Sequence, residues 1–302
     1  MAMAESSPSK AAPRADAPKT TLHGRTDYIP YDQRRLSYSN TFPSPWKRFV
    51  IRVLEWTTGK ITLIRKIRKF EKAGVPEGQP FWSKALVHMG VEIETPADEI
   101  ARIPAEGPVI IVANHPHGLV DGVVLAEMIG RVRTDYKILT RSLLTGIAEI
   151  AQFTIPVPFP HEEDAREKNL EMRRQTMEHL AAGGVIVIFP SGVVASSDTW
   201  WGPAIEREWN PFTAKMIRRS GATIVPIHFA GQNSRAYQIA NRVSATIRQG
   251  LLLHEVVHAL NKPQRPHIGQ PFKDEDIKAR EDNPRDLMAW MRDVTLALGR
   301  SD

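Results

Sequence analysis

Two stretches of the sequence place histidines beside carboxylates at spacings that permit chemistry. The first is NHPHGLVD, residues 114–121, where His115 and His117 precede Asp121. A carboxylate that orients an imidazole lets the histidine act as a general base toward a hydroxyl group. The second is LLHEVVHALN, residues 252–261, which contains the pattern H-E-x-x-H. The two stretches predict two different kinds of enzyme.

In the first stretch, His115 is the preferred base and Asp121 its orienting partner. His117 is the competitor, because side chains four residues apart also meet on a helix. The alternative is that Asn114, His115 and Asp121 cap a helix and satisfy loop amides. Short His/Asp spacings often match by accident, so the residues alone leave these interpretations open.

In the second stretch, His254 and His258 share one helix face and could hold a zinc ion, with Glu255 activating a metal-bound water. A zinc peptidase needs a third ligand, for which Glu275 or Glu281 is available downstream. However, the leucines and valines form one apolar stripe and both histidines fall opposite it, which is typical of a solvated helix face. We interpret the stretch as an amphipathic helix packed on a sheet and keep the zinc peptidase as a remote alternative.

Composition restricts the partners. The chain has 302 residues, 42% of them hydrophobic, which is enough for one sizeable core. It contains no cysteine, which excludes disulfides, thiolate metal sites and cysteine nucleophiles. The net charge of +6 and pI near 9.5 favour an anionic partner. No apolar run reaches the roughly 18–20 residues that span a bilayer, and no signal peptide is recognisable, so we expect membrane contact from one side.

Strands that alternate with helices are expected to position these residues. Short apolar runs end in loops at 107–116, 184–192 and 221–231, and a charged helical segment covers 162–184. This pattern predicts an α/β fold with a central, largely parallel sheet flanked by helices. Ligands bind such sheets at the carboxyl ends of the strands. We therefore expect NHPHGLVD, FPSG and HFAGQNS to converge there.

The N-terminal part of the chain differs in character. Residues 1–45 are rich in Pro, Ser, Ala, Lys and Arg, which predicts a mostly disordered arm. Residues 46–84 are predicted to contain basic amphipathic helices at a membrane interface, with a possible break at Gly59. The alternative is a helix pair packed on the main domain with solvated basic faces. The main domain is expected over 85–302.

Two blocks at the predicted strand ends are similar to blocks of the lysophospholipid acyltransferases, the family that includes the 1-acylglycerol-3-phosphate acyltransferases. That family has N-H followed by Asp after four intervening residues, which resembles Asn114, His115 and Asp121 here, although five residues intervene. Its F-P-E-G block resembles Phe189–Gly192, where Ser191 replaces the glutamate.

Two later blocks follow in the family's order. Ile224–Ile227 resembles the V-P-V strand, and Gly231–Ser234 follows it as in the hemolysin-type and ornithine-lipid branch. HIGQPF, residues 267–272, resembles the late I-G-x-P-I/F turn. The resemblance covers roughly 85 to 275, so the main domain at 85–302 is identified as an acyltransferase domain.

The resemblance implies an O-acyltransferase of membrane phospholipid biosynthesis. It would move a fatty acyl group from an acyl carrier protein or coenzyme A thioester to a lysolipid hydroxyl, with no cofactor. His115 would deprotonate the hydroxyl, Asp121 would orient His115, and the oxygen would attack the thioester directly. The chain has no G-x-S-x-G nucleophile elbow, which fits this mechanism. The expected location is peripheral, on the cytoplasmic face of the inner membrane, with an anionic membrane surface and not nucleic acid as partner.

The resemblance leaves more than one head group open for the lysolipid acceptor. The backbone at Ser191 and Gly192 would cradle the head group or the oxyanion. The arginines that bind phosphate in many members are missing beside these blocks, which leaves a 1-acylglycerol-3-phosphate held by Arg141 or Arg235, or a lyso-ornithine lipid or other aminolipid. Both arginines could also be plain surface residues, and a membrane-binding module with a decayed site is a third option. The candidate substrate-binding residues are Asn114, His117, Gly118, Arg141, Phe189, Pro190, Ser191, Gly192 and Arg235.

Overall fold

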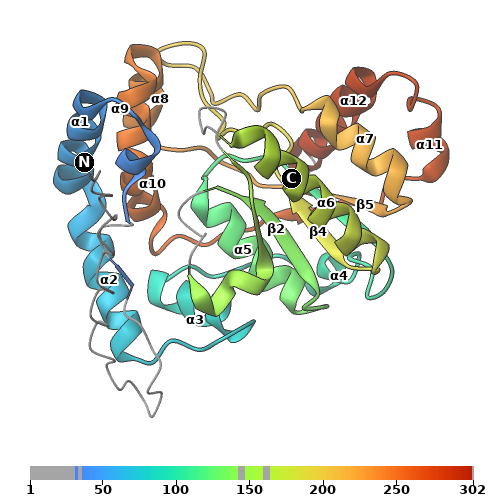
Figure 1. The fold of residues 1–302 in the computed structure, drawn as a ribbon, viewed down its shortest axis with the longest axis horizontal. Coiled ribbons are helices and arrows are strands. Elements are labelled where there is room, and N and C mark those ends of the chain that lie inside the picture. The colour runs from blue at the N-terminus through green and yellow to red at the C-terminus, as the bar shows by residue number, and fades with distance from the viewer. Residues whose placement is uncertain (1–30, 33–35, 142–146, 159–163, 301–302) are drawn as a thin grey trace, which may run out of the picture. The chain divides into compact units, whose positions relative to one another are not determined.

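A six-stranded sheet lies at the centre of the chain, with strand order β3-β2-β4-β1-β5-β6 (Figure 1). Strands β1 to β5 pair in parallel, and β6 pairs antiparallel with β5. The predicted α/β fold with a largely parallel sheet is confirmed. The strands are β1 (Val109–Ala113), β2 (Tyr136–Thr140), β3 (Thr154–Pro156), β4 (Val185–Ile188), β5 (Thr223–His228) and β6 (His267–Ile268).

The computed structural model describes residues 31–32, 36–141, 147–158 and 164–300. Most of the predicted arm at 1–45 lies outside these residues. From Tyr31 onward the described chain forms one compact unit. Its helices and helical turns are η1 (Tyr38–Thr41), α1 (Pro45–Glu55), η2 (Trp56–Lys60), α2 (Ile61–Lys72), α3 (Pro80–Met89), α4 (Ala97–Ile100), α5 (Leu119–Gly130), η3 (Ala148–Phe153), α6 (Ala165–Ala181), α7 (Pro211–Ser220), α8 (Arg235–Val243), α9 (Ala245–Gly250), α10 (Leu252–Ala259), α11 (Asp274–Lys278), α12 (Pro284–Ala297) and η4 (Leu298–Arg300).

Both faces of the sheet are covered by helices, which explains why its strands are continuous apolar runs. Successive side chains of a strand point to opposite faces. Val109 and Ile111 of β1 therefore join a core with α3, α5 and α10, while Ile110 and Val112 join a second core with α6, α7 and α12. All five residues of β1 are buried. The strand that leads to NHPHGLVD is thus held from both sides.

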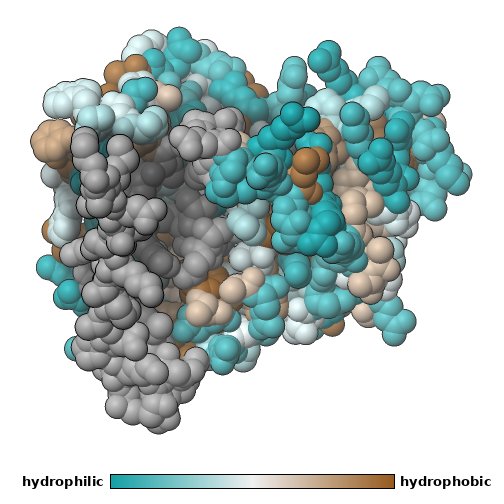
Figure 2. All heavy atoms as spheres, viewed as in Figure 1, coloured by the Kyte–Doolittle hydropathy of each residue, from teal (hydrophilic) through white to brown (hydrophobic). Residues whose placement is uncertain are grey.

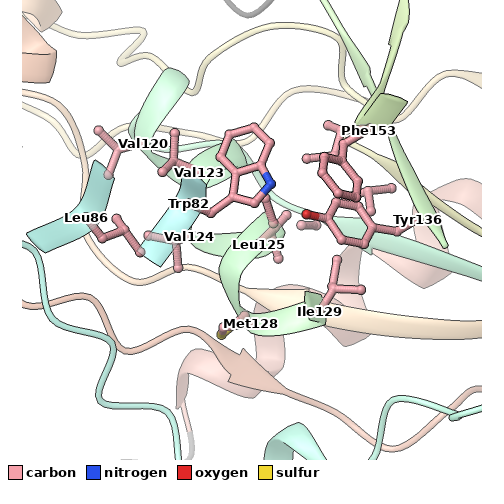
Figure 3. Close-up of a cluster of buried hydrophobic side chains, with 14 of the residues drawn as sticks. Trp82, Leu86, Val120, Val123, Val124, Leu125, Met128, Ile129, Tyr136 and Phe153 are labelled. Atoms are coloured by element: carbon pink, nitrogen blue, oxygen red, sulfur yellow. The ribbon is translucent and has the colours of Figure 1, made fainter. Parts of the chain in front are cut away.

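One aromatic cluster holds α5 against the sheet (Figure 3). Trp82 of α3 is fully buried, and its ring lies 6.2 Å from that of Phe153. Phe153 stacks on Tyr136 with ring centroids 4.8 Å apart. The Tyr136 hydroxyl donates to Gln79 Oε1 at 2.7 Å, and Gln79 Nε2 donates to the Ala126 carbonyl at 3.1 Å. These contacts fix α5, whose first turn carries Asp121.

The segment around Gly59 widens into a π-turn, η2, that connects α1 to α2 without a break. Gly59 packs against the start of α10, because a Cβ there would lie 3.0 Å from the backbone of Leu253 and His254. The other side of α1 exposes aromatic rings: Trp46 is 70% exposed and Phe49 57%. In contrast, Figure 2 shows mostly hydrophilic side chains over α6 and α11. None of the described helices is both long and apolar enough to span a membrane.

Candidate active site

Asp121 is the centre of the site and is fully buried. Its Oδ2 lies 3.0 Å from His115 Nδ1, and its Oδ1 lies 3.0 Å from His117 Nδ1. Oδ2 also accepts the backbone N–H groups of His117 and Gly118 at 2.9 and 3.1 Å. Because an ionised carboxylate only accepts hydrogen bonds, both imidazoles donate from Nδ1. Burial would raise the pKa of Asp121, but the hydrogen bonds from the two histidines outweigh burial and lower it.

The two histidines differ in what surrounds their other ring nitrogen. His115 stacks on Phe189 with ring centroids 3.9 Å apart and lines a cavity of about 510 Å³. His117 lies against the loop after β5, because a Cβ on Gly231 would come within 3.0 Å of its Nε2. Gly118 has φ 74° just before α5, a left-handed conformation that glycine adopts readily. The NHPHGLVD stretch thus presents His115 to the cavity and keeps His117 behind it.

His117 also interacts with the negative charge of Asp121. Burial works against its charged form, but the hydrogen bond and negative charge of Asp121 prevail and raise the pKa of His117. Its ring is 13% exposed, against 17% for His115. His117 is therefore placed to hold Asp121 in position from the side opposite His115.

Asn114 clamps two strand ends together. Its Nδ2 donates to the Phe229 carbonyl at 2.9 Å, and its Oδ1 accepts the Phe229 N–H at 2.7 Å. These two hydrogen bonds join the end of β1 to the end of β5. Asn114 is 5% exposed. Its amide, predicted to bind substrate, is engaged in the fold itself.

Glu206 is a residue of this site that the sequence did not reveal. Its Oε2 accepts the His115 backbone N–H at 3.1 Å, and its Oε1 accepts Trp209 Nε1–H at 3.0 Å. Burial raises the pKa of Glu206, although hydrogen bonds from His115, Trp209 and Ser191 oppose the change. The His115 carbonyl in turn accepts the Ala195 N–H at 2.8 Å. A carboxylate therefore does lie beside Ser191, but it comes from 15 residues further along the chain.

The FPSG block forms a tight turn at the end of β4. The Gly192 N–H donates to the Phe189 carbonyl at 2.9 Å, and Ser191 Oγ donates to the Val193 carbonyl at 3.0 Å. Asn210 N–H donates to the Pro190 carbonyl at 2.9 Å. The Gly192 amide is engaged in the turn, so the Ser191 amide is the oxyanion donor that this block offers, although Ser191 itself is not among the residues that line the cavity.

The cavity collects most of the predicted residues. Gly118, Phe189, Pro190 and Gly192 line it together with His115, and so does Arg141 at the end of β2. A volume of about 510 Å³ is in the range of small-molecule sites. Among the lining residues that the sequence did not single out are Tyr38, Tyr237 and Arg248.

Comparison with known proteins identifies the family. The acyltransferase family profile matches residues 50–295. The chain belongs to the acyltransferase family. It is 25% identical over 203 residues to a lyso-glycine lipid O-acyltransferase of Phocaeicola vulgatus, covering 65% of this chain and 69% of that protein. It is 26% identical over 167 residues to one of Bacteroides thetaiotaomicron, covering 54% and 58%.

Among solved structures, the acyltransferase is similar to the 1-acyl-sn-glycerophosphate (LPA) acyltransferase PlsC of Thermotoga maritima. The TM-score is 0.42 and the sequence identity 12%, over 72% of this chain and 77% of that chain.

Two predicted features of this acyltransferase lie away from the cavity. Arg235 is exposed, and its Nη1 donates to the carbonyls of Trp201 and Gly202 at 2.8 and 2.9 Å. Glu255 of the H-E-x-x-H pattern is buried, and its carboxylate accepts the N–H and Oγ–H of Ser234, both at 2.7 Å. His254 instead contacts the Thr58 carbonyl through Nδ1 at 3.2 Å. Within the described ranges, no three His, Cys, Asp or Glu residues group as a metal site. Glu255 therefore anchors the GQNS loop.

Proposed function

We propose that this acyltransferase acts on lysolipids, as the names of its relatives support, and transfers a fatty acyl group from the thioester of acyl carrier protein or coenzyme A to the hydroxyl of its acceptor, with His115 as general base. The observation that carries this proposal is the His115 imidazole, which contacts Asp121 through Nδ1 and lines the 510 Å³ cavity. With Nδ1 donating to Asp121, Nε2 is the unprotonated nitrogen that can accept a proton.

The reaction is a direct transfer through one tetrahedral intermediate. His115 Nε2 takes the hydroxyl proton as the acceptor oxygen attacks the thioester carbonyl. Asp121 stabilises the imidazolium that forms, and the Ser191 N–H donates to the oxyanion of the tetrahedral intermediate. The carbon–sulfur bond then breaks, and the thiolate takes the proton back from His115. The products are the acylated lipid and the free thiol.

The acceptor is an anionic lysolipid. The names of the two relatives support an aminolipid acceptor of the lyso-glycine lipid kind. 1-Acylglycerol-3-phosphate is the second candidate, because arginines, Arg141 among them, line the cavity and a guanidinium binds phosphate as well as carboxylate. Arg235 is less suited, since its guanidinium is bonded to loop carbonyls away from the cavity.

The enzyme would bind its acceptor at the cytoplasmic face of the inner membrane. Trp46, Phe49 and Trp56 are each more than half exposed on the α1–η2 segment. Lys47 and Arg52 lie among them and are exposed as well. Exposed aromatic rings interleaved with cations are the composition of helices that lie in an anionic lipid interface. This surface supports peripheral membrane binding.

An acceptor panel tests the proposal. Purified enzyme is given labelled acyl carrier protein or acyl-coenzyme A thioester with lyso-glycine lipid, lyso-ornithine lipid or 1-acylglycerol-3-phosphate, and the acylated lipid is measured. We expect transfer to at least one of these acceptors, with lyso-glycine lipid the best. If no acceptor and donor pair gives a product above the enzyme-free control, the proposed function is wrong and the decayed-site alternative replaces it.

A further inference from the structure

The cavity beside His115 has two walls of different origin. One is built by α8, α9 and η1, through Tyr237, Arg248 and Tyr38. The other is built by α6 and α7, through residues such as Met172 and Phe212. Figure 1 shows α8 and α9 on one side of the strands and α7 on the other. An acceptor and an acyl donor can therefore approach His115 from different sides.

Arg248 brings a positive charge to the first wall with no acid to neutralise it. Its Nη1 donates to Asn241 Oδ1 at 2.8 Å, and that partner is a neutral amide. In the described chain Arg248 makes no ion pair, and it is only partly exposed. A partly desolvated guanidinium attracts an anion more strongly than an exposed one does. The wall is thus charged for an anionic ligand.

Tyr237 adds a second polar group to the same wall. The residue is 2% exposed, and burial raises the pKa of its hydroxyl to about 12, although the charge of Arg248 opposes the change. The hydroxyl therefore stays protonated at neutral pH. A phenol that keeps its proton can donate a hydrogen bond to an anion that Arg248 holds.

The position of this wall distinguishes it from the other arginines of the cavity. Arg173 belongs to the opposite wall, where its guanidinium lies 4.5 Å from the Phe212 ring centroid. Arg248 lies on α9, which packs against α1 so closely that a Cβ on Gly250 would meet the Leu54 side chain. Because α1 carries exposed aromatic rings, the Arg248 wall is the one that packs against the proposed membrane surface.

We infer that Arg248, beside Tyr237, binds the anionic head group of the lysolipid acceptor. The ligand chemistry is a carboxylate or a phosphate, bound by charge-assisted hydrogen bonds from the guanidinium. This subsite rests on the proposed function and extends it, because it assigns the acceptor to one wall of the cavity and makes Arg248 the residue that selects a charged head group.

Matched acceptor pairs test the inference. Lyso-glycine lipid is compared with its methyl ester, and 1-acylglycerol-3-phosphate with neutral monoacylglycerol, using one acyl donor throughout. We expect wild type to prefer the charged member of whichever pair it uses. In Arg248→Gln, kcat/KM for the charged member falls on the order of 10- to 100-fold more than kcat/KM for the neutral member, mainly through KM, so the preference for the charged acceptor is lost. Arg248→Lys keeps an intermediate preference.

The ratio within a pair does not depend on how much of the variant is folded, because both acceptors meet the same preparation. Arg242→Gln is the matched control. It removes the same charge from an exposed position on α8 outside the cavity lining, and it should keep the wild-type ratio of kcat/KM between the charged and the neutral acceptor. If Arg248→Gln also keeps that ratio, the subsite is wrong while the proposed function stands. If wild type acylates no acceptor, the proposed function fails and the inference fails with it.

Discussion

Glu206 and His115 are 91 residues apart in the chain, yet the Glu206 carboxylate accepts the His115 backbone N–H at 3.1 Å. The same carboxylate accepts the Trp209 indole N–H at 3.0 Å. The family block that would supply a carboxylate here has Ser191 instead. The acid beside this loop thus comes from a distant segment of the chain, and it holds the backbone of His115 in place.

Glu206 is therefore expected to act as a positioning residue. In Glu206→Ala, two buried N–H donors lose their acceptor, which costs about 1–3 kcal/mol of stability for each. We expect a lower melting temperature and a kcat reduced about 10- to 100-fold, with KM for the acyl donor unchanged. Glu206→Gln keeps one acceptor oxygen and should restore part of both. The control is Glu208→Ala, an exposed neighbour; indistinguishable behaviour of Glu206→Ala and Glu208→Ala would refute this role.

The two histidines should separate in kinetic assays. His115→Ala removes the proposed base at the cavity, so we expect kcat to fall on the order of 100- to 10,000-fold. His117→Ala removes only the second contact to Asp121, and we expect a loss of about tenfold or less. Rates of acyl transfer, measured for both variants with a saturating acceptor, show which histidine is the base. Normal activity in His115→Ala together with loss of activity in His117→Ala would assign the base to His117.

The pKa of His117 predicts a pH dependence of stability. Because this pKa is raised above its ordinary value of 6.5, the charged pair with Asp121 stabilises the fold fully below pH 6.5. That contribution is lost as the pH rises through the raised pKa. The lowered pKa of Asp121 keeps its carboxylate ionised across this window.

Urea unfolding of wild type and His117→Gln across this range tests the expectation. The free energy of unfolding should differ most between the two proteins below pH 6.5, and the difference should shrink at alkaline pH. If the difference in the free energy of unfolding stays constant with pH, the charges of Asp121 and His117 do not stabilise the fold.

The exposed rings of α1 and η2 predict binding to vesicles. Replacing Trp46, Phe49 and Trp56 by Ser removes large apolar side chains that are already exposed, so the fold should be retained. We expect sedimentation with anionic phospholipid vesicles to fall at least tenfold, while turnover of a soluble short-chain acceptor is kept. Val87→Ser, at a 75% exposed position on α3, is the control and should bind vesicles like wild type. Full vesicle binding by the triple variant would contradict the proposed membrane surface.

Local pattern was sufficient to predict the sheet and the centre of the site. The run Val109–Ala113 is apolar at every position because both sheet faces are covered, and each such run ends where ligands bind. The sequence also pointed to Asp121 as the partner of a histidine. The spacing to His115 and the spacing to His117 looked like competing choices. The structure satisfies both, because a carboxylate has two oxygens and each histidine uses one.

The remaining site residues depend on contacts that no local spacing encodes. Glu206 lies in an irregular segment between β4 and α7, and Arg248 lies on a short helix that begins 17 residues after β5. Nothing in their neighbourhoods marks them apart from other charged residues. The H-E-x-x-H pattern shows the reverse problem. Its spacing matches a zinc site, but buried Glu255 is committed to Ser234. Tertiary contacts decide which charged residues serve the site.

Gly59 allows the η2 segment to pack closely against the start of α10. Any larger residue at this position would push the η2 segment away from the backbone of Leu253 and His254, which lies only 3.0 Å from where a Cβ would be. The next residue toward the cavity is Leu252, which forms part of its lining. We therefore expect that one added methyl group at this position, far from His115 in the chain, would displace Leu252 and alter the shape of the cavity.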